Sequence, residues 1–184
     1  MQVAGKTILL TGGTDGIGRE LAGQLKAKGA TVIVTGRTPE RIEAAKAAGY
    51  EVIAADLSSQ AGVDAILSAV MGRAIDILIN NAGLGSDHDF REAMPDLADN
   101  DRCIAANLNA PIHLITHLMP VLRARPEAMI VNVTSGLAIA PRSGGPIYCA
   151  TKAGLRSYTL ALRHQLRDTA IHVLEVLPPV VETK

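Results

Sequence analysis

Two residues four positions apart, Tyr148 and Lys152, have the clearest catalytic potential in this sequence. On a helix, residues at this spacing share one face, so the ammonium group of Lys152 can lie beside the phenol of Tyr148. An unperturbed phenol has a pKa of about 10, and a neighbouring positive charge favours its ionised form. The pair therefore predicts a tyrosine that transfers protons near neutral pH.

A glycine-rich run at residues 11–18, TGGTDGIG, predicts a binding site for phosphate groups. It follows the apolar run 7–10, which is typical of a buried strand, and it opens an amphipathic stretch at 17–28. In this context Gly12 allows a tight turn, Gly16 lets the backbone approach a pyrophosphate, and Gly18 permits close packing of helix on strand. Alone, such a glycine spacing also fits an ordinary flexible turn.

The elements that must position these residues alternate between strand and helix. Apolar runs predict strands at 7–11, 31–35, 51–55, 75–80, 129–134 and 171–176. Helices are expected at 17–28, 39–48 and 60–71, within 94–125, and at 147–167, with Pro111 and Pro120 bending or dividing the long region. The pattern predicts a doubly wound, Rossmann-type α/β fold with three layers, a parallel sheet and strand order 3-2-1-4-5-6.

Composition and charge exclude several classes of protein. The chain has 184 residues and 48% hydrophobic content, and no linker or low-complexity segment divides it, so we expect one domain over 1–184. Basic and acidic residues balance at 18 each, and aromatic residues are scarce, which argues against nucleic acid or a membrane surface as partner. Without a secretory signal or a long apolar run, the sequence predicts a soluble cytoplasmic protein.

The cysteines and histidines predict no metal site. Cys103 and Cys149 are too few and too scattered for a disulfide framework or a zinc site. His113 and His117 have a helical spacing that could seat zinc, but no glutamate lies between them and no third ligand is apparent. We therefore expect two reduced thiols and histidines on a helix surface or at a subunit contact.

Several motifs together resemble the short-chain dehydrogenase/reductase family over nearly the whole chain, from Lys6 to Thr183. They are the glycine run 11–18, the turn Asn80-Asn81-Ala82-Gly83, Ser135 thirteen residues before Tyr148, and Tyr148-x-x-x-Lys152. Segments 107–114, 133–138 and 162–166 and the pair Pro178-Pro179 are similar to the DltE-like branch of that family. The branch implies no particular substrate.

The resemblance implies four catalytic residues, Asn107, Ser135, Tyr148 and Lys152. In the reducing direction, Tyr148 would protonate a carbonyl oxygen that Ser135 also hydrogen-bonds, while nicotinamide delivers hydride to the carbon. Lys152 would hold the nicotinamide ribose and lower the pKa of Tyr148, and Asn107 would hold a water connected to Lys152. The substrate would be a small carbonyl or alcohol compound.

The resemblance also implies the cofactor contacts. Asp56 would accept from the adenine amino group, although a helix cap or turn residue is the alternative for it. Residues 81–83 would line the adenine ribose, and Thr183 would contact the nicotinamide carboxamide. The full predicted set is Gly12, Thr14, Asp15, Gly16, Ile17, Gly18, Arg37, Asp56, Leu57, Asn81, Ala82, Gly83, Tyr148, Lys152, Pro178 and Thr183.

The end of the second predicted strand favours NADP over NAD as the cofactor. Gly36 leaves no carboxylate there to repel a phosphate, and Arg37 can pair with one. Against this, Asp15 stands where a basic residue would strengthen the preference, and Arg37 could be a solvated surface charge. NAD therefore stays the second candidate.

The end of the chain departs from the family pattern. Residues 178–183 resemble the family's Pro-Gly-x-x-x-Thr segment, with Pro179 in the glycine position, and the sequence stops one residue after Thr183. Family members continue into a small lobe and a last strand, so we expect a fragment or a naturally short protein. A short protein would bind cofactor but turn substrate over slowly, because an open site excludes water poorly.

Two alternative functions and an assembly follow from these observations. A nucleotide-binding scaffold with little or no turnover is the main alternative. A nucleotide-sugar epimerase or dehydratase is disfavoured by the turn at 80–83 and by the short length of the chain. The helices after Met94 and Ile147 resemble the pair that packs family dimers, so we expect a homodimer or homotetramer. An apolar face with Leu155, Tyr158 and Leu162 would be buried in that interface.

Overall fold

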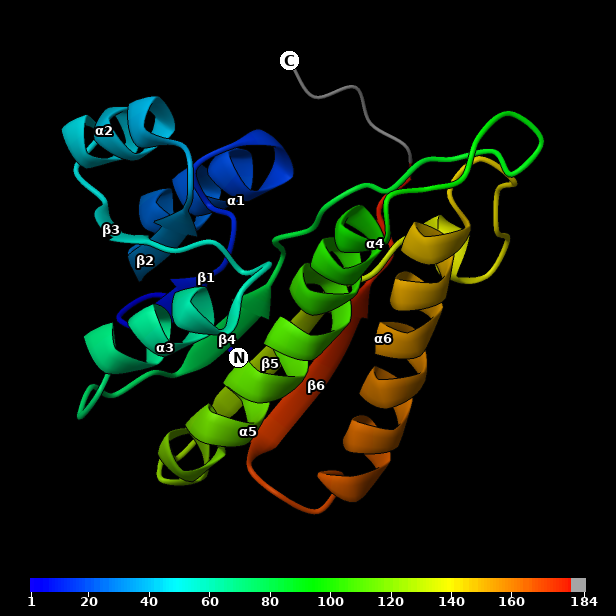
Figure 1. Cartoon of the computed structure of the whole chain (residues 1–184). Helices are drawn as coiled ribbons and strands as arrows, with labels where there is room; N and C mark the ends of the chain where they lie inside the picture. The colour runs from blue at the N-terminus through cyan, green and yellow to red at the C-terminus, as the bar shows by residue number, and fades with distance from the viewer. Residues whose placement is uncertain (180–184) are drawn as a thin grey trace.

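The computed structural model describes residues 1–179, which form a parallel sheet of six strands covered by helices (Figure 1). The strands are β1 (Thr7–Leu10), β2 (Thr31–Gly36), β3 (Glu51–Ala54), β4 (Ile77–Asn80), β5 (Ala128–Val133) and β6 (Ile171–Val176). Their order is β3-β2-β1-β4-β5-β6, which confirms the predicted topology. The first three strands are added towards one edge of the sheet and the last three towards the other, so the strand order reverses between β1 and β4. Doubly wound sheets bind their ligands at the carboxyl ends of the strands at this point.

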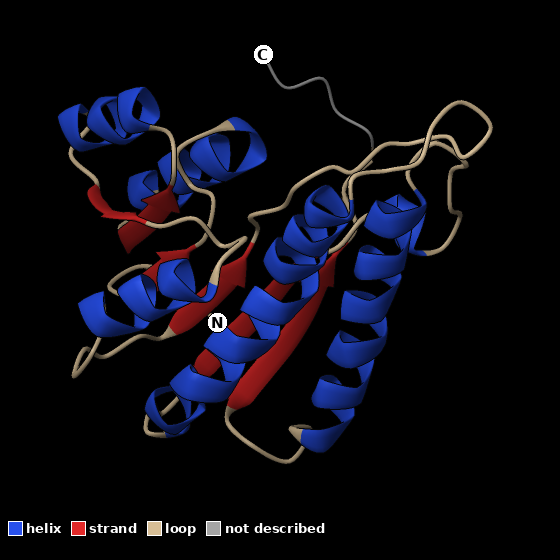
Figure 2. Ribbon diagram, viewed as in Figure 1, coloured by secondary structure: helices blue, strands red, loops and turns tan. Residues whose placement is uncertain are grey.

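Six α-helices connect the strands (Figure 2). They are α1 (Gly16–Ala27), α2 (Pro39–Ala47), α3 (Gln60–Ala69), α4 (Leu97–Ile104), α5 (Ala110–Arg123) and α6 (Pro146–Gln165), so every predicted helix is present. Pro39 and Pro146 begin α2 and α6, because the first position of a helix needs no N–H donor. None of the helices within residues 1–179 is long and apolar enough to cross a membrane.

The long helical region is divided, as predicted, but neither proline divides it. A wide π-helical turn, η1 (Ala105–Asn109), separates α4 from α5. Pro111 lies in the first turn of α5, directly after η1, and Pro120 lies inside α5 without ending it. The turn is important because it carries Asn107.

Alternate residues of each central strand enter two separate cores. Leu9 and Ile33 face a cluster that contains side chains of α3, α5 and α6, whereas Ile8 and Val32 face a cluster with α1 and α2. In Figure 1, α3, α5 and α6 lie in front of the sheet. Both faces are covered, and this is why the strands are continuous apolar runs.

The predicted interface face on α6 is wrong in part. Leu155 and Leu162 are buried within the chain itself, and Tyr158 is partly buried against the same core as Leu162. The helical spacing marked an apolar face correctly, but that face covers the chain's own sheet. A homodimer or homotetramer is still predicted, but Leu155 and Leu162 are not available to form its interface.

A row of buried polar side chains joins β4, β5 and α6. The Asn80 amide donates to Asn132 Oδ1 at 2.8 Å, and the Asn132 amide donates to Thr159 Oγ1 at 2.8 Å. The Thr159 hydroxyl then donates to the Leu155 carbonyl at 2.6 Å. Because these groups are buried, each needs its partner, so the row fixes α6 relative to the two strands.

Candidate active site

A cavity of about 550 Å³, here called the strand-end cavity, lies where the carboxyl ends of β2, β3 and β4 face the start of α1 and one side of α6. All of the predicted cofactor residues within the described part of the chain line it, from Gly12 to Pro178. Thr183 lies outside the described residues. Two predicted catalytic residues, Asn107 and Ser135, are not among the lining residues and lie in elements beside the cavity.

The glycine loop between β1 and α1 has the geometry of a backbone cradle. Gly12 and Gly16 have φ of 67° and 48°, a region that favours glycine. A Cβ on Gly18 would lie 2.1 Å from the carbonyl oxygen of Gly12, so only glycine lets α1 approach the loop this closely. Asp15, the N-cap residue, makes no side-chain hydrogen bond to the first turn of α1, which leaves the N–H groups there available to an anion.

Asn81 ties the end of β4 to this loop. Its side-chain amide donates to the carbonyl oxygens of Thr11 at 3.0 Å and Gly12 at 3.3 Å. The Thr11 hydroxyl accepts in return from the backbone N–H groups of Asn81 and Ala82. The Asn81 amide therefore ties the end of β4 to the end of β1, and Asn81 also lines the cavity.

Two exposed ion pairs lie at the β2 end of the strand-end cavity. Arg37 lies 3.7 Å from Asp56, and Arg41 lies 2.5 Å from Asp15. A Cβ on Gly36 would lie 2.3 Å from Thr14 Oγ1, so no acidic side chain fits at the end of β2 in this arrangement. The sequence predicted Arg37 as a cofactor residue but did not predict Arg41. The only signal for Arg41 was its position in the first turn of α2, four residues after Arg37.

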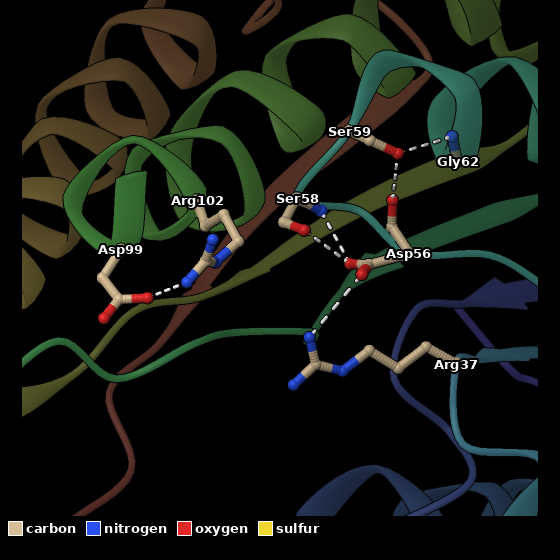
Figure 3. A network of polar contacts seen from close by, with 7 residues as sticks. All are labelled: Arg37, Asp56, Ser58, Ser59, Gly62, Asp99 and Arg102. Atoms are coloured by element: carbon tan, nitrogen blue, oxygen red, sulfur yellow. Dashed lines mark hydrogen bonds and ion pairs between the residues drawn. The ribbon is translucent and has the colours of Figure 1, made fainter. Parts of the chain in front are cut away.

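Asp56 shapes the turn between β3 and α3 (Figure 3). Its Oδ1 accepts from the N–H of Ser58 at 3.0 Å and from the Ser58 hydroxyl at 2.8 Å. Burial alone would raise the pKa of Asp56, but the Ser58 hydrogen bonds and the charge of Arg37 bring it below its usual value. The cap of α3 is Ser59, which accepts from Gly62, so Asp56 has the turn role considered for it and still faces the cavity.

Tyr148 and Lys152 lie on one face of α6 and both line the strand-end cavity. The Lys152 Nζ atom is 5.7 Å from the centre of the Tyr148 ring and donates to the Val133 carbonyl at 2.9 Å. Val133 is the last residue of β5, so this bond joins α6 to the strand that leads to Ser135. The predicted pairing of the two side chains is present.

The pKa of Tyr148 does not shift in the direction expected from the sequence. Burial raises the pKa of Tyr148 above its usual value, and the neighbouring Ser135 hydroxyl and Arg142 guanidinium oppose this only in part. Burial also lowers the pKa of Lys152 to about 8, since the ammonium group is almost fully removed from solvent. The pKa of Tyr148 is therefore not lowered as expected, because burial outweighs the groups that lower it, and Lys152 is not among those groups.

Ser135 follows β5 and caps a short 3₁₀ turn, η2 (Gly136–Ala138), where its hydroxyl accepts from the N–H of Leu137 at 3.1 Å. Such a cap uses a lone pair of the hydroxyl and leaves its hydrogen free to point elsewhere. The Ser135 hydroxyl also lies close enough to Tyr148 to lower the phenol pKa. Ser135 therefore lies beside Tyr148 and is held in place by its hydrogen bond to the η2 turn.

Asn107 is fully buried and is held by the loop after β4 and by helix α6. Its Oδ1 accepts from the N–H of Leu84 at 2.7 Å, and its Nδ2 donates to the Leu84 carbonyl at 2.8 Å and to Thr151 Oγ1 at 3.1 Å. A Cβ on Gly83 would lie 3.3 Å from Asn107 Oδ1 and 3.5 Å from Lys152 Nζ, so both groups face the same small space.

Two further residues support Asn107 and were not expected from the sequence. Thr151 accepts from Asn107 and donates its own hydroxyl to the Tyr148 carbonyl at 2.7 Å. The Cys103 thiol lies 3.3 Å from Asn107 Nδ2 and 3.3 Å from the Leu84 carbonyl. The only sequence signal that Thr151 supports the site was its position next to Lys152. Cys103 had no such signal, because the π-helical turn η1 brings it beside Asn107.

A doubly wound sheet with a glycine cradle and a Tyr-Lys pair facing one cavity defines a Rossmann-type enzyme class, the nucleotide-binding oxidoreductases. Within that class, the family described as short chain dehydrogenase matches residues 6–184. The chain belongs to this family and is an oxidoreductase of it.

Known proteins agree with this assignment. The chain is 40% identical to the uncharacterized oxidoreductase DltE of Bacillus subtilis, covering all of this chain and 74% of that protein. It is similar to L-sorbose reductase from Gluconobacter frateurii, solved with NADPH and L-sorbose, with a TM-score of 0.89, 30% identity and coverage of 100% and 73%. A short chain dehydrogenase/reductase from Burkholderia phymatum, solved with NAD, has a TM-score of 0.87, 26% identity and coverage of 100% and 68%.

Proposed function

We propose that this protein interconverts a small carbonyl compound and the corresponding alcohol with a nicotinamide cofactor, and that Tyr148 is the general acid and base. The observation that carries the proposal is that the glycine cradle and the Tyr148-Lys152 pair line one and the same cavity. A scaffold that only binds nucleotide would not need a buried lysine, a buried asparagine and a serine gathered around one tyrosine.

The residues present fit a dinucleotide. The uncapped first turn of α1 and the glycines at 12, 16 and 18 suit a pyrophosphate, and the small residues at 81–83 leave room beside it. Asp56 and Leu57 lie at the end of the cavity where an adenine would be held. When bound, the nicotinamide cofactor supplies or accepts the hydride.

NADP is the proposed cofactor, and NAD is the second candidate. Arg37 and Arg41 offer two guanidinium groups beside Gly36, where a 2′-phosphate would be placed. Each arginine is paired with an exposed carboxylate, and an exposed pair of this kind is held by only about 0–1 kcal/mol. A phosphate can therefore take the place of the carboxylate at small cost. The known relatives support both cofactors, since one was solved with NADPH and another with NAD.

The proton chemistry follows from the environment of Tyr148. Since its pKa is raised, the phenol is protonated at neutral pH and ready to donate to a carbonyl oxygen. Ser135 would offer a second hydrogen bond to that oxygen and stabilise its developing charge. Lys152 would orient the ribose hydroxyls and supply positive charge, and Asn107 would connect it to solvent by way of the space beside Gly83.

Titration with NADPH and NADH, followed by a screen of ketones and alcohols, tests this function. Gly18→Ala should weaken cofactor binding strongly, because its Cβ would meet the Gly12 carbonyl at 2.1 Å. Gly23→Ala is the matched control in the same helix, where the nearest atom, the Tyr50 hydroxyl oxygen, is 3.9 Å away. Equal cofactor binding by the two variants, or no turnover in the whole screen, would contradict the proposal.

A further inference from the structure

An ion pair between Arg142 and Asp87 joins the two loops next to the start of α6. Asp87 belongs to the loop that follows β4, and Arg142 belongs to the loop between η2 and α6. The N–H of His88 donates to the Gly144 carbonyl at 3.0 Å, so the loops are also joined by their backbones. Figure 1 shows them side by side beyond the start of α6.

The guanidinium group of Arg142 lies close to Gly145, the residue just before α6. A Cβ on Gly145, the N-cap of that helix, would lie 3.2 Å from Arg142 Nε and 3.3 Å from its Nη2. Gly145 is three residues before Tyr148, so the cation is about one helical turn from the proposed acid. Burial raises the pKa of Tyr148, and the charge of Arg142 is among the groups that lower it, which agrees with this short separation.

Most of the donors of this arginine are unused within residues 1–179. Only Nη2 makes a hydrogen bond, to Asp87, whereas Nε and Nη1 make none. The Arg142 and Asp87 side chains are 51% and 61% exposed, so the pair contributes little to folding. An arginine with free donors beside a reactive tyrosine, held by one exchangeable carboxylate, is suited to bind another carboxylate in the two-pronged manner that guanidinium groups favour.

We infer that Arg142 determines substrate specificity by binding a carboxylate of the substrate while Tyr148 acts on the carbonyl or hydroxyl group. The substrate class is therefore the small oxo acids and hydroxy acids. Asp87 holds the guanidinium in place until the substrate carboxylate takes its position. This inference rests on the proposed function for the turnover step, but the carboxylate site can also be tested by binding alone.

Matched acids and esters distinguish this role from a purely structural one. Pyruvate and acetoacetate are compared with their methyl esters as substrates for the wild type, Arg142→Gln and Arg142→Lys. Loss of a hydrogen bond to a charged group lowers kcat/KM by about 10- to 100-fold, so we expect that loss in Arg142→Gln for the acid, mainly through KM. Turnover of the ester should stay nearly unchanged, and Arg142→Lys should recover part of the loss.

Arg167→Gln is the control, since Arg167 is an exposed arginine that also pairs with an aspartate, Asp168, at the far end of α6. Calorimetric titration with malonate, which cannot be turned over, measures the site without catalysis. Equal losses for acid and ester in Arg142→Gln, or malonate binding that Arg142→Gln leaves unchanged, would overturn the inference. If the wild type turns over neither acid nor ester, the proposed function fails, and the malonate titration still decides the inference.

Discussion

The polar side chains at the β2 end of the strand-end cavity are exposed to solvent, whereas those at the α6 end are buried. At the β2 end, the side chains of Arg37 and Asp56 are 53% and 47% exposed and lie in an ion pair on the surface. At the α6 end, Lys152 is 3% exposed and Asn107 is fully buried, and both are held by hydrogen bonds to the backbone. Exposed charges keep their solvent, whereas buried ones must find partners in the protein.

This difference separates the two roles that we propose for the cavity, cofactor selection at the exposed end and proton transfer at the buried end. Residues at the exposed end can be exchanged with little effect on folding, so the proposed preference for NADP over NAD should be adjustable there. Residues at the buried end are tied to β4, β5 and α6, and their pKa values depend on that packing. Substitutions at the two ends should therefore alter different measured quantities.

The largest effect is expected at the buried end from Tyr148→Phe. Removing the general acid should lower kcat by about 100- to 10,000-fold, with little change in the affinity for NADPH. Steady-state kinetics and a binding titration measure the two quantities. Tyr158→Phe, in the same helix but outside the strand-end cavity, is the control and should retain turnover. Full turnover by Tyr148→Phe would exclude the proposed acid.

Lys152→Met should abolish most turnover and yet stabilise the fold at neutral pH. The folded-state pKa of about 8 lies below the ordinary value of 10.5, so burying the charged form opposes folding. The full penalty is present below pH 8 and is lost as pH rises toward 10.5, where the unfolded chain also releases its proton. A shift of this size corresponds to about 3 kcal/mol.

Because the variant also loses the hydrogen bond from the charged Lys152 to Val133, we expect a net gain of only about 0.5–2 kcal/mol in the free energy of unfolding at pH 7. Urea unfolding of both proteins between pH 7 and 10.5 measures it. The advantage of Lys152→Met should shrink as pH rises. A constant difference, or one that grows with pH, would contradict the burial of a charged lysine.

At the exposed end, Arg37→Ser should change cofactor preference without changing stability. We expect the ratio of kcat/KM for NADPH over NADH to fall by about 10- to 100-fold, since a hydrogen bond to a charged phosphate is lost. The free energy of unfolding should stay within about 0.5 kcal/mol of the wild type, as for other exposed substitutions. Arg41→Ser should act in the same direction, and an unchanged ratio in both variants would argue for NAD.

The smallest effect is expected from Thr151→Val, which touches neither substrate nor cofactor. Its hydroxyl links Asn107 to the Tyr148 carbonyl, so its loss should let the Asn107 amide reorient. We expect kcat to fall by about 3- to 10-fold, consistent with one buried hydrogen bond, with KM unchanged. Thr151→Ser should restore kcat, and a loss in KM alone would exclude this positioning role.

Much of the fold was predictable because its signals are local. The six strands end within two residues of their predicted limits, since an apolar run bounded by glycine or polar residues marks a buried strand in any context. The glycine loop was equally readable, because Gly12 and Gly16 have positive φ and a Cβ on Gly18 would meet the Gly12 carbonyl oxygen. The positions of Tyr148 and Lys152 on one helix face follow from the periodicity of the helix alone.

Tertiary structure decided what depends on distant parts of the chain. Leu155 and Leu162 face the chain's own sheet, Arg41 joins Arg37, and Cys103 and Thr151 hold Asn107, because packing and the π-helical turn bring these groups together. The pKa of Tyr148 is raised although a lysine lies one turn away, since burial depends on all the elements around the side chain. The sequence by itself determined which groups have catalytic potential, and the folded environment decided in which direction their pKa values shift.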